Sequence, residues 1–329
     1  MLRRASSLLA TLTAIFALAL HPAAAQQAED AQPPAHTQPF PNLGQGETRE
    51  EVIASFEQAP HLQRGLPVRE MMEQRRRLDA ALGAIAPPRP GVVDAYIVSI
   101  ALDSDPVFAR EAREAALVLS ARYDGAGRSL VLAGPDGVRD DAPHGSIRSL
   151  LLSLGHIAEI MDPGEDVLVL YTTSHGVKLG LSYHYGDTGY GILSPARLKS
   201  VFDELGIERR LLILSACFSG VFVPVLAGPE TAILTAAAAE RASFGCDPEN
   251  DWTFFGDALI NRALRRPQPL REAAHEASRT IAKWESERRL LASLPQSMIG
   301  AGAERWLSEL EANMPRTASA PVGRPAVGE

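Results

Sequence analysis

The sequence has few cysteines and none of the usual metal or nucleotide motifs. Cys217 and Cys246 are its only two cysteines, and they do not form a C-x-x-C pair or join a close group of histidines. We therefore expect no bound metal and no cofactor. No strand-like run leads into a G-x-G-x-x-G loop, a Walker loop or a G-x-S-x-G turn, so nucleotide binding and serine hydrolysis lose their main support.

An excess of positive charge is also lacking. The formal net charge is -8, which gives no reason to expect a nucleic-acid partner. The 329 residues are 46% hydrophobic and 22% charged, values typical of a globular protein with one large domain or two small ones. Beyond the N-terminus, no stretch is apolar enough to span a bilayer.

The first 25 residues have the pattern of a secretory signal peptide. Arg3 and Arg4 precede an apolar run from Leu8 to Leu20, and three alanines end the segment before Gln26. An uncleaved membrane anchor is the alternative, but the run is short for a span. We expect an exported protein, periplasmic or secreted, with no stable membrane span after cleavage.

The rest of the chain divides into three parts by composition. Residues 26–90 form a Pro- and Gln-rich linker and a helical segment, a candidate prosegment that ends at the proline cluster 86–90. Residues 91–300 alternate strand-like and helix-like runs. Residues 301–329 are expected to hold a short helix and a disordered tail.

The alternation in 91–300 predicts a mostly parallel sheet with helices on both faces. The expected strands are the runs at 95–102, 129–133, 166–171, 211–215, 231–236 and 297–300. A Gly- and Tyr-rich hairpin is expected at 180–191. Asp105 is expected to cap a helix whose first-turn residue is Pro106.

Two of the expected strands end in residues that carry chemistry. The run 167–171 leads to His175 and Gly176, and the run 211–214 leads through small residues to Cys217. The carboxyl ends of parallel strands meet at one edge of a sheet, where open α/β folds bind ligands. A thiol nucleophile needs a nearby base, so this arrangement favours a Cys–His pair.

These motifs resemble a known family. Thr173-Ser174-His175-Gly176 and Ser215-Ala216-Cys217-Phe218-Ser219-Gly220 resemble the His-Gly and Ala-Cys signature of caspase-like cysteine peptidases of clan CD, and the legumain family in particular. The segment 235–246 and Phe255-Gly256-Asp257 are similar to legumain segments too. The resemblance implies a caspase-like three-layer α/β/α sandwich with a mostly parallel six-stranded sheet, and a peptide or protein as substrate.

The resemblance also implies roles for single residues. Cys217 would be the nucleophile and His175 the base, and the backbone N–H groups of Gly176 and Cys217 would hold the oxyanion. His144 and His184 are alternative candidates for the base. Asp103, at the end of the first strand, is a candidate for orienting His175.

The substrate pocket departs from the family pattern. Phe218 stands where legumains typically have an acidic residue, and the arginine that follows the first strand in legumains has no clear counterpart. Ser243 and Asp257 match pocket residues of the family. With no arginine to balance Asp257, we expect the pocket to favour a basic or neutral-polar side chain and to reject an acidic one.

Several alternatives remain open at this point. An acyl-enzyme attacked by an amine instead of water would make the protein a transpeptidase or ligase. A protein that keeps the fold without catalysis would be a binding protein, although the intact His175–Cys217 pair argues against it. A further alternative is that Cys217 and Cys246 form a structural disulfide, which would leave neither thiol free to react.

Overall fold

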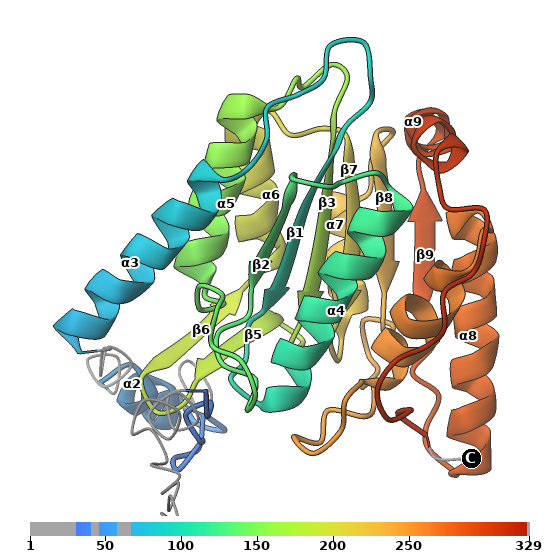
Figure 1. Cartoon of the computed structure of the whole chain (residues 1–329). Helices are drawn as coiled ribbons and strands as arrows, with labels where there is room; N and C mark the ends of the chain where they lie inside the picture. Colours follow the sequence, from blue (N-terminus) through green and yellow to red (C-terminus); the bar gives the residue numbers. More distant parts are fainter. Residues whose placement is uncertain (1–30, 41–45, 58–66, 328–329) are drawn as a thin grey trace, which may run out of the picture.

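The computed structural model describes residues 31–40, 46–57 and 67–327, and its centre is a six-stranded sheet (Figure 1). The strand order is β2-β1-β3-β7-β8-β9. The strands are β1 (Ala95–Ala101), β2 (Ser129–Leu132), β3 (Val167–Thr173), β7 (Arg210–Ser215), β8 (Thr231–Thr235) and β9 (Gln296–Ile299). The first five pair in parallel and β9 is antiparallel to β8, which confirms the predicted sheet.

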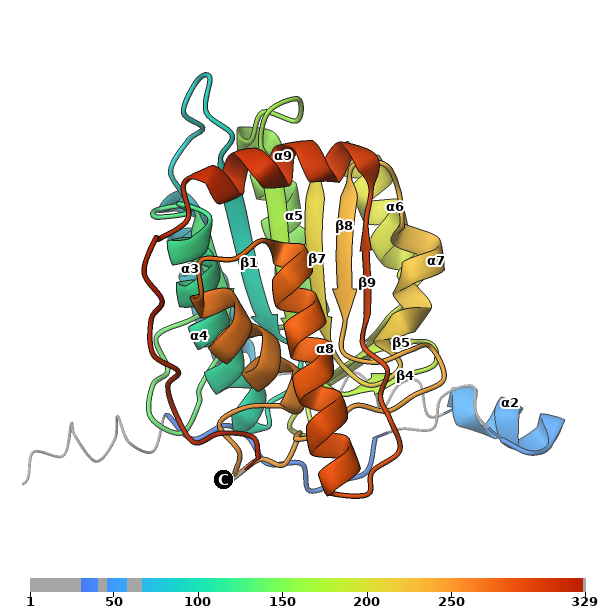
Figure 2. The same ribbon diagram turned by 90° about the vertical axis from the view of Figure 1, so that its right-hand side faces the viewer.

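Helices cover both faces of this sheet, which explains the unbroken apolar runs of its central strands. On one face lie α4 (Pro106–Arg122), the π-helix Gly256–Arg262, α8 (Leu270–Glu287) and α9 (Ala301–Ala312). On the other face lie α3 (Val68–Gly83), α5 (Ile147–Ile160), α6 (Pro195–Leu205) and α7 (Val223–Leu226). Figure 2 shows α8 in front of the strands and α6 and α7 beyond them. The predicted three-layer α/β/α sandwich is confirmed.

Local sequence explains where several of these helices begin. The side chains of Ser146 and Ser194 accept hydrogen bonds from the amides of Ser149 and Arg197, so they cap α5 and α6. Asp105 takes the capping position of α4, followed by Pro106, but its side chain makes no capping hydrogen bond. That carboxylate is therefore available for other contacts.

A small antiparallel sheet lies beside the carboxyl ends of the central strands. It consists of β4 (Gly176–Val177), β5 (Gly180–Tyr185) and β6 (Gly189–Leu193), in the region where a hairpin was predicted. β4 starts directly after His175. The backbone of β5 also reaches β1, because the amide of His184 donates to Leu102 and the amide of Ser104 donates to His184. The small sheet thus links the ends of β1 and β3.

Parts of the predicted linker and of the C-terminal tail make hydrogen bonds with the rest of the chain. Residues 31–40 lie against the loops after β1 and β5, where the amides of Thr37 and Gln38 donate to Asp187. The C-terminal tail lies along the π-helix, where the amide of Val322 donates to Asn261. Both predictions missed these contacts because the partners are distant in the sequence.

The remaining predictions about the N-terminus have mixed outcomes. The helical pattern before the proline cluster corresponds to α2 (Arg49–Glu57) and α3. The predicted signal peptide lies outside the described residues. Within the described part of the chain, no helix combines the length and apolarity that a membrane crossing requires.

Candidate active site

His175 and Cys217 follow the carboxyl ends of two neighbouring strands. β3 and β7 are paired up to Thr173 and Ser215, and the amide of Ser174 extends this pairing with a 3.2 Å hydrogen bond to Ser215. Each functional residue lies two positions beyond the last strand residue of its own strand. The structure therefore brings the two predicted residues to the same edge of the sheet.

The loop after β3 and the loop after β7 touch at Gly176. A Cβ atom placed on Gly176 would lie 2.0 Å from the carbonyl oxygen of Cys217, a separation that no side chain can tolerate. Glycine is therefore required for the backbone after His175 to reach the backbone of Cys217. This contact explains the His-Gly sequence in physical terms.

His175 is partly open to solvent and is polarised by an acid. Its side chain is 41% exposed, and its Nε2 atom lies 3.5 Å from Oδ2 of Asp105. The ring of Phe108 meets the imidazole edge-on, with a centroid distance of 5.1 Å. Burial alone would lower the pKa of His175, but the hydrogen bond with Asp105 and the charges of Asp103, Asp105 and Cys217 outweigh it and raise that pKa.

Two acids therefore lie near His175 where the sequence pointed to one. Asp103 is buried and burial raises the pKa of its carboxyl to about 6, although the charge of His175 acts in the opposite direction. Its Oδ1 atom accepts the amide hydrogen of Asp105 at 2.9 Å. Asp105 is the residue paired directly with His175, so the acid two positions after the predicted one makes the contact.

The sulfur of Cys217 is surrounded by polar groups of the loop after β8. The amide of Ser243 donates to Sγ at 3.2 Å, and the Ser243 hydroxyl lies 3.6 Å from it. The thiol of Cys246 lies close to this sulfur, and both cysteines are free. Together with Ser243 and the charge of His175, the Cys246 thiol lowers the pKa of Cys217 from 9.0 to about 5, against the effect of burial. The lowered pKa favours the thiolate, the form of cysteine that acts as a nucleophile.

Phe218 adopts a backbone conformation that is rare for a residue other than glycine. Its φ is 57° and its ψ is 11°, in the left-handed region. The amide of Phe218 donates to the carbonyl of Arg241 at 2.8 Å, which ties the residue after Cys217 to the loop that carries Ser243. Strained residues of this kind cluster at functional sites.

Asp257 does not occupy the place that the sequence predicted for it. Its carboxylate is fully buried in the π-helix and accepts hydrogen bonds from Asn261, Arg262 and the amide of Ala326. Arg262 supplies the balancing positive charge that was thought to be absent. The expected use of Asp257 as an unbalanced acid in the substrate pocket is therefore wrong.

Sequence reasoning missed Glu111, a buried acid between the two strand ends. Its Oε1 atom accepts hydrogen bonds from the hydroxyls of Tyr171, Thr173 and Ser215 at 2.5, 2.8 and 3.0 Å. Its Oε2 atom accepts from the amide of Thr253 at 2.7 Å. The available signal was an acid in the apolar face of a helix opposite strands that end in hydroxyl residues. Glu111 connects β3 and β7 just before His175 and Cys217.

The two alternative histidines lie in different surroundings. His144 is buried beside Tyr185 and Gln74, and burial, with a smaller effect of Arg77, lowers its pKa to about 3. His184 is buried on β5 and stacks on His36, and burial, with the charge of His36, lowers its pKa to about 4. Neither has the acid contact that raises the pKa of His175.

Comparison with known proteins agrees with the resemblance of the motifs. Residues 151–303, which include His175, Cys217 and Ser243, match the model of the Peptidase C13 family. Caspase-1 from Spodoptera frugiperda is one of the solved structures that match, with 14% identity, a TM-score of 0.43, and coverage of 65% of this chain and 93% of that chain. No curated protein matches. Over residues 151–303 the chain is thus similar to the Peptidase C13 family, the legumain family of cysteine peptidases.

Proposed function

We propose that the protein is a cysteine endopeptidase in which Cys217 attacks the scissile carbonyl and His175 carries the proton. The observation that carries the proposal is the contact between the loops after β3 and β7 at Gly176, because one loop carries a polarised histidine and the other a thiol of lowered pKa. Similarity to a cysteine peptidase family supports the reaction class.

The reaction would proceed through a thioester. The Cys217 thiolate adds to the carbonyl carbon of the peptide bond, and the imidazolium of His175 then gives its proton to the departing amine. A water molecule next loses a proton to His175 and attacks the thioester, which releases the acid product and restores the thiol. Asp105 would keep the imidazole in the orientation that these two transfers need.

The oxyanion would be held by the N–H groups of Gly176 and Cys217. Gly176 lies opposite Leu181 in the β4–β5 hairpin, and the next pair outward, His175 and Ser182, is hydrogen-bonded. Because hydrogen-bonded and non-hydrogen-bonded pairs alternate in an antiparallel ladder, the Gly176 amide points away from the hairpin. This orientation leaves it available to a substrate.

Replacement of Cys217 tests the proposal most directly. Cys217→Ala should abolish hydrolysis of a peptide library, and an irreversible thiol-reactive label should mark Cys217 in the active protein. Cys246→Ser is the matched control, because it removes the neighbouring thiol and keeps the nucleophile. Full activity in Cys217→Ala would falsify the proposal, as would a quantitative Cys217–Cys246 disulfide in active protein.

We also propose that the protein acts outside the cytoplasm after cleavage near Gln26, on the pattern of its first 25 residues. N-terminal sequencing of the protein purified from its own cell envelope would show a start near residue 26. A start at Met1 in envelope-associated protein would indicate an uncleaved anchor.

A further inference from the structure

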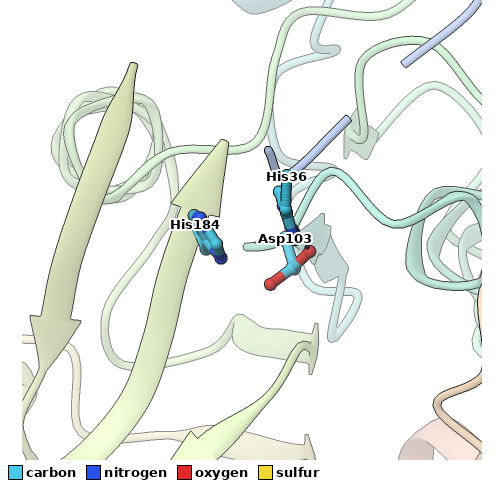
Figure 3. Close-up of side chains that lie close together, drawn as sticks. All are labelled: His36, Asp103 and His184. Atoms are coloured by element: carbon cyan, nitrogen blue, oxygen red, sulfur yellow. Dashed lines mark ion pairs between the residues drawn. The ribbon is translucent and has the colours of Figure 1, made fainter. Parts of the chain in front are cut away.

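A second group of ligand-type side chains lies at the loop 103–105 and shares Asp103 with the group around His175. His36, Asp103 and His184 come from three different segments, and their nearest donor atoms all lie within 4.8 Å of one another. Nε2 of His36 is 3.4 Å from Oδ1 of Asp103, and the rings of His36 and His184 stack at 3.6 Å. Figure 3 shows the His184 imidazole on its strand facing the other two side chains.

Two atoms of this group have unmet bonding capacity. Oδ2 of Asp103 and Nε2 of His184 are buried and have no hydrogen-bond partner among the residues that the structure describes. Asp103 is 2% exposed and His184 is 7% exposed, so water does not readily compensate either atom. A buried polar atom without a partner is unfavourable. Two such atoms in one group of ligand-type side chains point to a binding site.

Backbone contacts place the two buried ligands. Asp103 and His184 are bridge partners between the end of β1 and β5. The amide of His184 donates to Leu102 at 2.9 Å, and the amide of Ser104 donates to His184 at 3.0 Å. The positions of these two side chains are thus set by main-chain hydrogen bonds on both sides.

The third side chain is placed by the segment 31–40. The Ser104 hydroxyl donates to the carbonyl of Pro34 at 3.0 Å, and the Thr37 amide donates to Asp187 at 3.0 Å. His36 lies between these two anchors, and its Nε2 atom is 2.9 Å from the Ser104 hydroxyl. The N-terminal segment therefore brings an imidazole to the two buried ligands.

We propose that His36, Asp103 and His184 together bind one divalent transition-metal ion of the Zn²⁺ type. Two imidazoles and one carboxylate suit zinc and its neighbours, whereas calcium and magnesium take oxygen ligands. Tetrahedral zinc with bonds of about 2.0–2.1 Å needs ligand atoms about 3.3 Å apart. The two rings must therefore turn out of their stack, so that both nitrogens point to the ion.

The ion would tie the N-terminal segment to the loop that ends β1. His36 is the only proposed ligand outside residues 91–300, so binding would fasten residues 31–40 onto the domain. The ligands lie at positions 36, 103 and 184, too far apart in the chain to form a recognisable spacing motif. For this reason no metal was expected from the sequence.

Zinc binding to the full chain tests the proposal without reference to peptidase activity. The parent protein carries Cys217→Ala and Cys246→Ala, because both thiols also bind zinc. Equilibrium dialysis and calorimetry with ZnCl₂ should give one ion per chain. His184→Ala and His36→Ala should each weaken binding by at least about a hundredfold, since loss of an outer partner alone costs about 10–100-fold. His275→Ala, which changes an exposed histidine on α8, should leave it unchanged.

A second measurement follows the N-terminal segment itself. Zinc should slow hydrogen exchange of the amides in 31–40 in the parent and should not do so in His36→Ala. His36 lies outside the hydrophobic core, in a segment without a helix or strand, so this variant tests the site without a change in the core. Absence of zinc binding in the parent, equal binding in His184→Ala and His275→Ala, or unchanged binding in His36→Ala would each overturn the three-ligand site.

Discussion

The loop from Asp103 to Asp105 separates two histidines that lie close in the chain and behave in opposite ways. His175 is partly exposed, pairs with Asp105 and has a raised pKa. His184 is buried, stacks on another imidazole and has a pKa lowered to about 4 by burial first and by the charge of His36 second. Both lie within reach of the same two acids.

The difference shows that the presence of an acid does not by itself activate a histidine. Oδ2 of Asp105 lies 3.5 Å from Nε2 of His175, so the positive form of that ring is stabilised. Nε2 of His184 has no hydrogen-bond partner among the described residues, so burial dominates there. One side of the loop is suited to proton transfer and the other to binding a cation as a neutral ligand.

The largest expected effect comes from removal of the histidine on the reactive side. His175→Ala should lower turnover by at least about a hundredfold, the low end for a general acid–base group. Steady-state kinetics on a peptide substrate, with thermal melts to check folding, would measure this. Unchanged turnover in His175→Ala together with an inactive His184→Ala or His144→Ala would show that the base has been assigned wrongly.

Replacement of the shared acid should alter the pH dependence. In the wild type, activity should rise as Cys217 ionises near pH 5 and fall as His175 loses its proton above its ordinary pKa of 6.5. Asp105→Asn removes the contact that raises the His175 pKa, so the alkaline fall should move to lower pH. Turnover should drop by about tenfold, part of the hundredfold or more that an acid–base group contributes.

The pH–rate profile of both proteins, recorded with a chelator present, checks this prediction. Asp203→Asn is the control, since it changes an exposed acid on α6 that pairs with Lys199. Asp103→Asn should move the alkaline limb in the same direction as Asp105→Asn, because the charge of Asp103 also raises the His175 pKa. An alkaline limb that stays in place in Asp105→Asn would mean that Asp105 does not set the His175 pKa.

A smaller effect is expected from replacement of Glu111, the buried acid that joins the ends of β3 and β7. Glu111→Gln removes one of the acceptor oxygens and leaves at least one buried donor unpaired, which should cost about 1–3 kcal/mol of unfolding free energy. Turnover should fall several-fold because the ends of β3 and β7 lose their common partner. Urea unfolding and kinetics measure the two effects, and Glu114→Gln, on the same helix, is the control. Equal stability of the two variants would contradict the role given to Glu111.

The smallest effect is expected on the other side of the loop. His184→Ala, assayed with a chelator, should keep turnover within about twofold of the wild type, because a neutral ring without a contact to His175 contributes little to proton transfer. A tenfold loss in this variant, with folding intact, would place His184 in the reactive group and erase the contrast between the two sides.

The central sheet and the Cys–His pair could be predicted because their signals are local. Strands buried on both faces leave unbroken apolar runs, and parallel strands deliver their last residues to one edge. His175 and Cys217 each follow such a run directly. Order along the chain and strand pairing were sufficient to bring them together.

The rest of the site depends on partners that local patterns do not reveal. Asp105 was interpreted as a helix cap, and it does take that position, but its carboxylate turns to His175 instead. Asp257 was expected to lack a balancing arginine, and Arg262 lies one helical turn later. Glu111 and the segment around His36 make their contacts with residues far away in the sequence. Side-chain direction and long-range docking decided all four cases.

The contact at Gly176 has a consequence for how the Cys217–His175 pair can persist during evolution. Because two main chains meet there, the separation of the backbones that carry His175 and Cys217 is set by the radii of backbone atoms. These radii are the same in every protein, whereas the width of a hydrophobic core varies with its side chains. The reactive pair can therefore persist while the surrounding sequence drifts widely. A single added methyl group at residue 176 would disturb it more than many exchanges among the core aliphatics.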